Sequence, residues 1–265
     1  MGILNVTPDS FHDGGRHATL DLALSHAEAL LAAGADIIDI GGESSRPGAE
    51  PVDEAEELTR TQPVVAGIVK RFACPVSIDT VKSSVARAAL DAGACIINDI
   101  SAMTYDPMML EVPQAFQAGV VLNHMRGSPK CMQIDPIYSD AVAEVTAFLA
   151  GRIQLLAAMG MTKDHIAVDP GMGFGKRVED NYRLIAEMEK LGVLGCPILL
   201  GMSRKSFIQK TPGLETSTRL MPSVALAVFA ALKGVSILRV HDVGETREAL
   251  LMVEAVQSGA AEKWG

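Results

Sequence analysis

Aromatic residues and positive charge are both scarce in this sequence. Phe, Trp and Tyr together make up 4% of the 265 residues, and the formal net charge is −9. Nucleic acids and anionic membranes attract proteins through a basic field, so this charge argues against either as the main partner. A small anionic substrate remains compatible with it, because a few local cations are enough to hold one.

The four cysteines form neither a metal-binding nor a disulfide pattern. Cys74, Cys95, Cys131 and Cys196 include no C-x-x-C pair, and none has a histidine at zinc-site spacing. We expect reduced and mostly buried thiols. The sequence also shows no signal peptide and no apolar run of the roughly 18 residues that suggest a membrane span. These absences predict a cytoplasmic protein with no membrane partner.

The sequence is rich in aliphatic residues that can fill a large core. Hydrophobic residues make up 48% of the chain, and a length of 265 residues is normal for one α/β barrel. A pattern recurs: a helical stretch ends at Gly, and a short β-branched run follows and ends in a polar residue. Ala33-Gly34 precedes Ile37–Asp39 in this way, and Ala92-Gly93 precedes Ile96–Asp99. Glycine suits the left-handed position after a helix, and the short runs are typical of buried parallel strands.

Eight strands and eight helices are expected from these patterns. The strands are Gly2–Asn5, Ile37–Asp39, Val76–Asp79, Ile96–Asp99, Val120–His124, His165–Asp169, Pro197–Gly201 and Ile237–His241. The helices are Leu20–Ala33, Glu54–Phe72, Ser83–Ala92, Pro107–Ala118, Tyr138–Gly160, Asp180–Leu191, Ser223–Lys233 and Glu245–Ser258. Their alternation, with no linker and no G-x-G-x-x-G fingerprint, predicts an α/β fold: a (β/α)8 TIM barrel forming one domain over residues 1–265.

Each predicted strand ends in or near a polar residue able to do chemistry. These residues are Asn5, Asp39, Asp79, Asn98, His124, Asp169, Ser203, Arg239 and His241. In a barrel all such ends meet at one face, where active sites lie. Asp79, Asn98 and Asp169 supply acceptors and an amide, which suit a neutral, nitrogen-rich heterocycle with several N–H donors.

Cations gather on another part of the same predicted face. Arg46 follows strand two, Arg204 and Lys205 follow strand seven, and Arg239 and His241 end strand eight. Loops after strands seven and eight of barrels often hold phosphate, so we expect a phosphate site beside the heterocycle site. Two loops rich in Pro, Gly and polar residues, 7–15 and 41–48, are expected to act as lids.

Seven short motifs resemble, in order, the signatures of the dihydropteroate synthase family. They are Asn5–Phe11, Gly41–Gly48, Ile78–Thr80, Ile97–Ile100, Asp169–Lys176, Ser203–Ser206 and Arg239–Asp242. The resemblance extends from Gly2 to about Val256. It implies condensation of para-aminobenzoate with 6-hydroxymethyl-7,8-dihydropterin diphosphate, which gives 7,8-dihydropteroate and pyrophosphate in folate biosynthesis. It also implies a homodimer built from the C-terminal helices.

The resemblance assigns roles to individual residues. The pterin is held by Asp79, Asn98, Asp169 and Lys205, and the diphosphate by Asn5, Ser45, Arg239 and His241. Asn5, with the departing diphosphate, binds Mg2+. The para-aminobenzoate pocket is formed by Phe11, Arg46, Pro47, Phe174 and Ser206, together with Lys205. Asp79, Lys205, Arg239 and His241 are the expected catalytic residues.

Two positions depart from the family pattern, and one absence has a consequence. Ser45 replaces the usual Thr, which keeps the hydroxyl and loses a methyl. Asn123 stands where we expect an apolar residue, and we expect it to point outward. The segment Gly173–Lys176 has no insertion of the kind seen in sulfonamide-insensitive enzymes, which predicts ordinary sulfonamide sensitivity.

Two other functions fit part of the pattern. A pterin-binding methyltransferase barrel of the corrinoid or methionine synthase type shares the Asp/Asn cradle. It would lack the Asn5–Phe11 and Ser203–Ser206 motifs. A non-catalytic paralogue that binds pterin or a partner protein typically loses loop or cation residues, whereas Arg46, Lys205 and Arg239 are present here.

Overall fold

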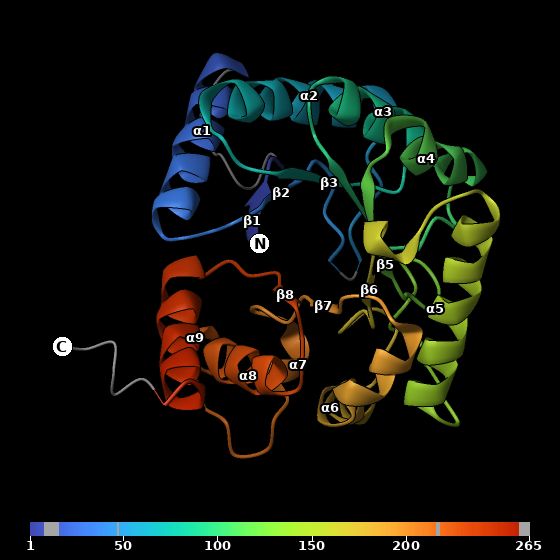
Figure 1. Ribbon diagram of the computed structural model, residues 1–265, viewed down its shortest axis with the longest axis vertical. Helices are drawn as coiled ribbons and strands as arrows, with labels where there is room; N and C mark the ends of the chain where they lie inside the picture. Colours follow the sequence, from blue (N-terminus) through green and yellow to red (C-terminus); the bar gives the residue numbers. More distant parts are fainter. Residues whose placement is uncertain (8–15, 47, 216–217, 260–265) are drawn as a thin grey trace.

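The computed structural model describes residues 1–7, 16–46, 48–215 and 218–259. In this part of the chain eight parallel strands form two sheets, one of β1–β6 in chain order and one of β7 and β8. Parallel bridges between Val168 and Ile198 and between Gly2 and Val240 join the two sheets. The strands therefore close into a barrel, and the predicted (β/α)8 TIM fold is confirmed (Figure 1).

Most of the strands are short and buried, as the sequence predicts. Their bounds are β1 Gly2–Asn5, β2 Ile38–Gly41, β3 Val76–Asp79, β4 Ile96–Asp99, β5 Gly119–Asn123, β6 Ile166–Asp169, β7 Leu199–Leu200 and β8 Ile237–Leu238. The helices form an outer ring around the strands (Figure 1), and the core lies between the two layers. A smaller apolar cluster of Val121, Ala167 and Leu199, on β5, β6 and β7, packs with the partly buried Met1 and Ile96.

The helical segments alternate with the strands. They are α1 Arg16–Ala32, α2 Glu54–Arg71, α3 Ser83–Asp91, α4 Val112–Phe116, α5 Ala141–Ala158, α6 Val178–Ala186, α7 Ser206–Gln209, α8 Leu220–Leu232 and α9 Val243–Gln257. Three further segments of the described residues are 3-10 helices: η2 Pro107–Glu111, η3 Lys163–His165 and η4 Met188–Leu194. The expected helix Pro107–Ala118 is thus a 3-10 turn followed by a short α-helix, and Gln117, at φ 52°, ends it.

The register of the strands places polar side chains on one interior row. Asn5 pairs with Gly41, Gly41 with Asp79, and Asp79 with Asn98. Registered neighbours in a parallel sheet point to the same face, so Asn5, Asp79 and Asn98 point the same way. Asp169 pairs with Asn123 on β5 in the same manner.

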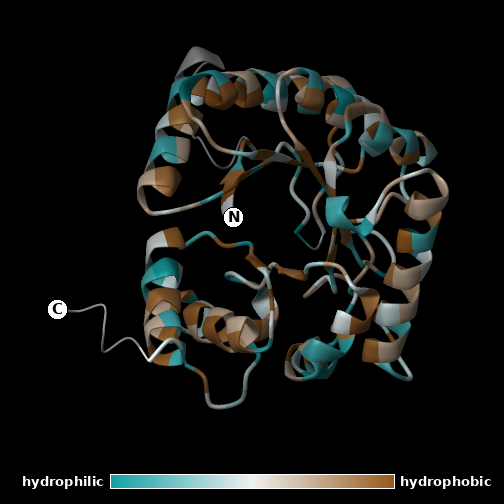
Figure 2. Cartoon of the chain, viewed as in Figure 1, coloured by the Kyte–Doolittle hydropathy of each residue, from teal (hydrophilic) through white to brown (hydrophobic). Residues whose placement is uncertain are grey.

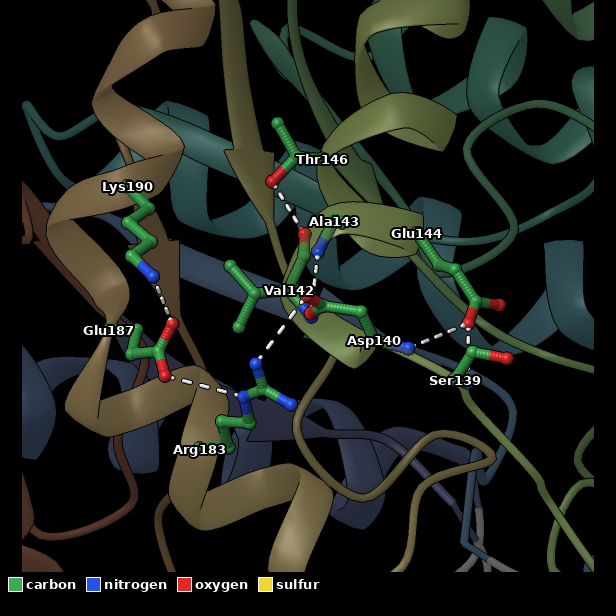
Figure 3. Close-up of polar contacts among 9 residues, drawn as sticks. All are labelled: Ser139, Asp140, Val142, Ala143, Glu144, Thr146, Arg183, Glu187 and Lys190. Atoms are coloured by element: carbon green, nitrogen blue, oxygen red, sulfur yellow. Dashed lines mark hydrogen bonds and ion pairs between the residues drawn. The ribbon is translucent and has the colours of Figure 1, made fainter.

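The start of α5 shows why the expected helix Tyr138–Gly160 is shorter than predicted. Asp140 accepts hydrogen bonds from the backbone N–H groups of Val142 and Ala143, at 3.1 and 3.2 Å. Glu144 reaches back to the backbone N–H groups of Ser139 and Asp140, at 2.8 and 3.2 Å (Figure 3). These bonds satisfy the free donors of the first turn and fix Asp140 as the N-cap.

By length and composition alone, α5 could cross a membrane, because its 18 residues have a mean hydropathy of 1.4. This differs from the expectation that no apolar run reaches that length. Within the described residues α5 packs as one helix of the outer ring, with Val145, Leu149, Ile153 and Leu156 buried. A single such helix is weak evidence for a membrane span, since a helix packed within a soluble protein passes the same test of length and composition.

The cysteines are free, but not mostly buried. Cys196 is buried and Cys74 is half-buried, whereas Cys95 and Cys131 are exposed. Cys95 lies just before β4 and Cys131 in the loop after β5, and both places are open to solvent. The expectation of mostly buried thiols was therefore wrong for two of the four.

The last two long helices leave a large apolar surface uncovered. On α8 and α9 the exposed large side chains are Met221, Phe229, Leu232, Leu251, Met252 and Val256. Figure 2 shows hydrophobic colour over much of α8. The two helices also pack against each other. Exposed apolar side chains on two adjacent helices are the kind of feature that interaction surfaces carry.

Candidate functional site

Three polar residues at the ends of β3, β4 and β6 lie at the mouth of the barrel. The Asp79 side chain is 13% exposed, while Asn98 and Asp169 are 4% and 6% exposed. Asp169 accepts a hydrogen bond from the backbone N–H of Gly171 at 2.6 Å. Burial raises the pKa of Asp169 above its ordinary value, and the Gly171 bond acts in the opposite direction. The predicted heterocycle residues therefore line one largely buried surface.

Arg239, directly after β8, connects this surface with the residues predicted to hold phosphate. Its Nε donates to Asp39 Oδ2 at 2.6 Å, and its Nη2 donates to Asp79 Oδ2 at 2.7 Å. Burial alone would lower the pKa of Arg239, but the two carboxylates raise it, so the guanidinium stays charged. Asp39 also accepts from Asn98 Nδ2 at 3.2 Å. Asp39 thus links two predicted site residues, a role that its place in the sequence did not suggest.

Asp79 is a carboxylate that gains protons easily in this environment. Burial raises its pKa to about 7, the charge of Arg239 opposes that rise, and the nearby carboxylates of Asp39 and Glu57 add to it. An Asp that titrates near neutrality can be present in either form at physiological pH. The protonation of Asp79 is therefore coupled to what binds beside it.

Lys205, at the start of α7, reaches across to the segment that follows β6. Its Nζ donates to the carbonyl of Met172 at 2.5 Å and lies 3.8 Å from the centre of the Phe174 ring. Burial lowers the pKa of Lys205 to about 8, although the charge of Asp169 opposes this shift. A cation over an aromatic face is stabilised by the ring quadrupole. The structure thus brings together Lys205 and Phe174, both of them predicted site residues.

A cavity of 280 Å³ opens beside Ser206, the first residue of α7. Its wall includes Gly173, Lys176 and Asn181 from the loop after β6 and from α6. Ser206 itself is exposed. Of the residues expected to hold para-aminobenzoate, Ser206 lines this cavity, whereas Phe174 and Arg46 do not.

His241 is held by a hydroxyl group. Its backbone N–H donates to Ser203 Oγ at 3.1 Å, and its Nδ1 lies 3.0 Å from the same oxygen. Burial and the charge of Arg239 lower the pKa of His241 to about 4, so the ring is neutral near pH 7. Because Ser203 Oγ already accepts from the backbone, its hydrogen is available for Nδ1. This arrangement favours the tautomer with N–H on Nε2, a donor suited to an anion.

The remaining predicted site residues lie on or next to the first two loops. Asn5 ends β1, and a Cβ built on Gly41 would lie 3.6 Å from Asn5 Oδ1 and 3.8 Å from Asp79 Oδ2. Ser45 is half-buried and Arg46 is exposed, and the charge of Arg46 contributes to lowering the pKa of His241. The charge of Arg46 thus acts on the His241 ring. Phe11 and Pro47 lie outside the described residues.

Arg204 does not face the same space as Lys205. Its guanidinium pairs with the carboxylate of Asp242, with a distance of 3.0 Å from Nε to Oδ2. Its backbone is left-handed, at φ 57°, and its N–H donates to Ser223 Oγ at 3.0 Å. Arg204 thus connects the segments after β7 and β8 on the solvent side. The sequence had suggested that it lies at the mouth of the barrel.

Two further residues of this region were not identified from the sequence as a pair. Lys176 Nζ lies 2.9 Å from His124 Nδ1 and donates to the carbonyl of Phe174 at 3.1 Å. Both side chains are less than 10% exposed, and burial lowers the pKa of each. Asn123 is 2% exposed, shares the face of Asp169 and donates to Ile100 at 2.8 Å. The expectation that Asn123 points outward was wrong.

The sequence resembles known proteins over nearly all of its length. The family described as "Pterin binding enzyme" matches residues 1–241. The dihydropteroate synthase of Escherichia coli strain K12 is 47% identical over 263 residues, which cover 99% of this chain and 93% of that protein. The dihydropteroate synthase of Bacillus subtilis strain 168 is 41% identical, with 97% and 87% coverage.

Solved structures agree with this result. Yersinia pestis dihydropteroate synthase in a sulfonamide drug complex superposes with a TM-score of 0.90 at 47% identity, covering 97% of this chain and 93% of that one. The Xanthomonas albilineans enzyme in complex with 7,8-dihydropteroate has a TM-score of 0.86 at 43% identity, with 97% and 92% coverage.

Proposed function

The chain belongs to the dihydropteroate synthase family, and we propose that it condenses para-aminobenzoate with 6-hydroxymethyl-7,8-dihydropterin diphosphate, releasing pyrophosphate. The observation that carries this proposal is the joined set of Asp79, Arg239 and Asp39 at the mouth of a barrel related to known synthases. The substrates are small molecules in the related enzymes, whose structures include a complex with 7,8-dihydropteroate. We expect the same class of substrate here.

The pterin is proposed to bind against Asp79, Asn98 and Asp169. Two carboxylates can accept from the guanidine-like N–H edge of a pterin, and binding of these donors repays part of the cost of burying the charges. Lys205, whose pKa is affected by the charge of Asp169, can donate to a pterin oxygen or nitrogen. The pterin would thus meet the acceptors of Asp79, Asn98 and Asp169 together with one cation, Lys205.

The diphosphate is proposed to bind to Arg239, His241, Ser45 and Asn5. Departure of pyrophosphate leaves a positive exocyclic carbon that is conjugated with the pterin. Arg239 and His241 stabilise the charge that develops on the leaving oxygens. Asp79 provides negative charge near the developing cation. The amine of para-aminobenzoate then attacks this carbon and loses one proton to the departed pyrophosphate or to solvent, and no protein nucleophile is needed.

We infer that Mg2+ binds together with the diphosphate. The described residues contain no group of three or more His, Cys, Asp or Glu side chains that could hold a metal. Asn5 offers one amide oxygen, and Mg2+ is commonly held by one or two protein oxygens plus substrate phosphates and water. The residues therefore fit a metal that arrives with its substrate. When bound, Mg2+ would neutralise charge on the leaving pyrophosphate.

The para-aminobenzoate pocket is proposed to consist of Phe11, Arg46, Pro47, Phe174 and Ser206, beside Lys205. The first two loops, 7–15 and 41–48, are proposed as lids, and their residues 8–15 and 47 lie outside the described residues. Lids over this site would exclude water, which would otherwise capture the cation. Sulfonamides resemble para-aminobenzoate, and we expect ordinary sensitivity to them. Turnover that persists in saturating sulfamethoxazole at low para-aminobenzoate would contradict this expectation.

We also propose that the chain forms a homodimer through the exposed apolar surface of α8 and α9. That surface includes Phe229, Leu232, Leu251 and Met252, and a second copy of the chain would cover it.

Residues 1–265 are proposed to form one domain in a cytoplasmic protein. The four free cysteines support a reducing compartment.

The experiment that tests this function is the detection of 7,8-dihydropteroate by mass spectrometry after incubation with both substrates and Mg2+. A methyltransferase barrel would form no such product, and a non-catalytic paralogue would bind the pterin without turnover. Lys205→Ala and Asp79→Asn should abolish product formation while the circular dichroism spectrum is preserved. Normal activity of either variant would overturn the assignment of these residues.

A further inference from the structure

The base of the loop after β2 is packed tightly onto α2. A Cβ built on Gly42 would lie 2.6 Å from Thr61 Cγ2 and 2.9 Å from Glu57 Cγ, so only glycine fits without a shift. Arg60 Nη1 donates to the carbonyl of Gly42 at 2.8 Å. The chain therefore leaves β2 along a fixed path. Ser45 and Arg46 follow three and four residues later.

A half-buried lysine holds the next residue of this loop. Lys82, just before α3, donates to Glu57 Oε2 at 2.5 Å and also to Glu43 Oε2. The Lys82 and Glu57 side chains are 13% and 1% exposed, and that of Glu43 is 23% exposed. One ammonium group thus connects the loop after β2 with α2 and with the segment after β3.

The charges of this group keep Lys82 in place. Burial lowers the pKa of Lys82, but its hydrogen bonds to Glu43 and Glu57 more than offset this effect, and the net shift is upward. Glu57 Oε1 is buried and has no hydrogen-bond partner among the described residues. Removing an ammonium from beside such a carboxylate is costly, so Lys82 stays with Glu57. Glu43 is then the arm that attaches the loop.

The far end of the same loop is attached to the loop after β5. The backbone N–H of Gly48 donates to the carbonyl of Pro129 at 3.1 Å, and Lys130 pairs with Glu50 at 3.2 Å. The Lys130 and Glu50 side chains are 65% and 75% exposed, and an ion pair this exposed contributes little. Between Glu43 and Gly48 there are only four residues, and they include Ser45 and Arg46.

We propose that Glu43 and Lys82 form a positioning pair that sets where Ser45 and Arg46 lie relative to the barrel mouth. Neither residue is assigned to the proposed substrates. The inference rests on the proposed function, in which Ser45 binds diphosphate and Arg46 borders para-aminobenzoate. The attachment at Glu43 is largely buried, whereas the far end is held by one backbone hydrogen bond at Gly48 and an exposed ion pair at Glu50. The pair at Glu43 is therefore the main side-chain determinant of where the segment lies. Its loss should affect substrate binding more than the fold.

The test uses Glu43→Gln, which removes the charge of the loop arm and leaves Lys82 paired with Glu57. We expect the KM for para-aminobenzoate to rise about 10-fold, since small misplacements of binding groups are costly, while kcat changes much less. Glu28→Gln, which removes an exposed ion pair with Arg71, is the matched control and should leave both constants unchanged. A KM for Glu43→Gln equal to that of the wild type would overturn the proposal.

A double variant separates positioning from a general loss of stability. If Glu43 acts through Lys82, the effects of Glu43→Gln and Lys82→Met on the KM should be far from additive. Additive effects would contradict the pair. Should Lys82→Met fail to fold, Glu43→Gln alone still decides through its KM.

Hydrogen exchange distinguishes failure of this proposal from failure of the proposed function. Amides of residues 43–46 should exchange faster in Glu43→Gln than in the wild type or in Glu28→Gln, whether or not the enzyme turns over. Unchanged exchange would refute the positioning pair. Absence of product from the wild-type protein would refute only the proposed reaction.

Discussion

Arg239 donates to Asp79 at 2.7 Å, so the residue assigned to the diphosphate directly contacts a residue assigned to the pterin. The same guanidinium donates to Asp39, which also accepts from Asn98. Asp39 is fully buried. The two halves of the site are therefore one hydrogen-bonded group, and a change in one half is expected to affect the other.

Replacing Asp39 with Asn should change the orientation of the Arg239 guanidinium. The variant keeps the side-chain shape but loses the charge that faces Nε of the guanidinium. Removing one of two charge-assisted partners should raise the KM for the pterin diphosphate by about 10-fold or more. The KM for para-aminobenzoate should change less. Steady-state kinetics check this, with Asp36→Asn, at the exposed start of the β2 region, as control. Equal changes in both KM values would contradict it.

The stability effect of Asp79 should depend on pH in a defined direction. Its pKa in the folded protein is about 7, against an ordinary value of 3.8, so the folded state binds this proton more tightly. Asp79 therefore lowers the free energy of unfolding progressively as pH rises from about 4 to about 7. Asp79→Asn removes this loss. The melting temperature of the variant minus that of the wild type should therefore be larger at about pH 8 than at about pH 4.5.

Asp140 provides a control of the opposite sign. Hydrogen bonds from the backbone N–H groups of Ala143 and Val142 lower its pKa (Figure 3). Its stabilisation is present above the ordinary pKa of Asp and is lost as the pH falls through the lowered value. Asp140→Asn should therefore be most destabilising near neutral pH. The same pH trend in both variants would rule out the account given for Asp79.

Lys205 should set an alkaline limit on activity. Burial lowers its pKa to about 8, and the proposed contact with pterin needs the ammonium form. The kcat/KM for the pterin diphosphate, which reports groups of the free enzyme, should fall above about pH 8. Lys205→Arg should retain part of the activity and lose this alkaline limb, because arginine stays charged. Lys205→Met should lose about 100-fold or more at neutral pH. An unchanged alkaline limb in Lys205→Arg would show that another group titrates there.

A charge placed on α9 should break the proposed dimer. Leu251 is 51% exposed within the apolar surface, and Leu251→Glu would bury an unpaired carboxylate between two copies. Sedimentation equilibrium should show the wild type as a dimer and this variant as a monomer. Val193→Glu, at a 77% exposed position on η4, should leave the dimer intact. A monomeric wild type would refute the proposal.

The barrel could be predicted from the sequence because its signals are local. Glycine after several of the helices and β-branched runs before polar residues identify strands such as Ile96–Asp99 without any knowledge of tertiary contacts. Element ends were predicted less well where side chains decide them. Asp140 and Glu144 shorten α5, and the left-handed Gln117 ends α4. Such caps depend on individual hydrogen bonds, which hydrophobic periodicity does not reveal.

The candidate site shows the same contrast between features that the sequence predicts and features that depend on individual contacts. Strand ends predicted which residues reach the mouth, because parallel strands place them together. They did not predict that Asp39 aims Arg239, or that Lys176 lies against His124. These pairings join residues that are far apart in the chain, and their geometry follows from the twist and closure of the barrel. Asn123 was predicted to point outward because a polar residue stood where an apolar one was expected. Its register with Asp169, which decides its direction, cannot be read from the sequence.

The central claim is most directly tested by measuring pyrophosphate release from 6-hydroxymethyl-7,8-dihydropterin diphosphate. The wild-type protein should release pyrophosphate with Mg2+ and para-aminobenzoate present, in equal amount to the dihydropteroate formed. Asp79→Asn, compared under the same conditions, should release none. No release from the wild type with or without para-aminobenzoate and Mg2+ would contradict the account.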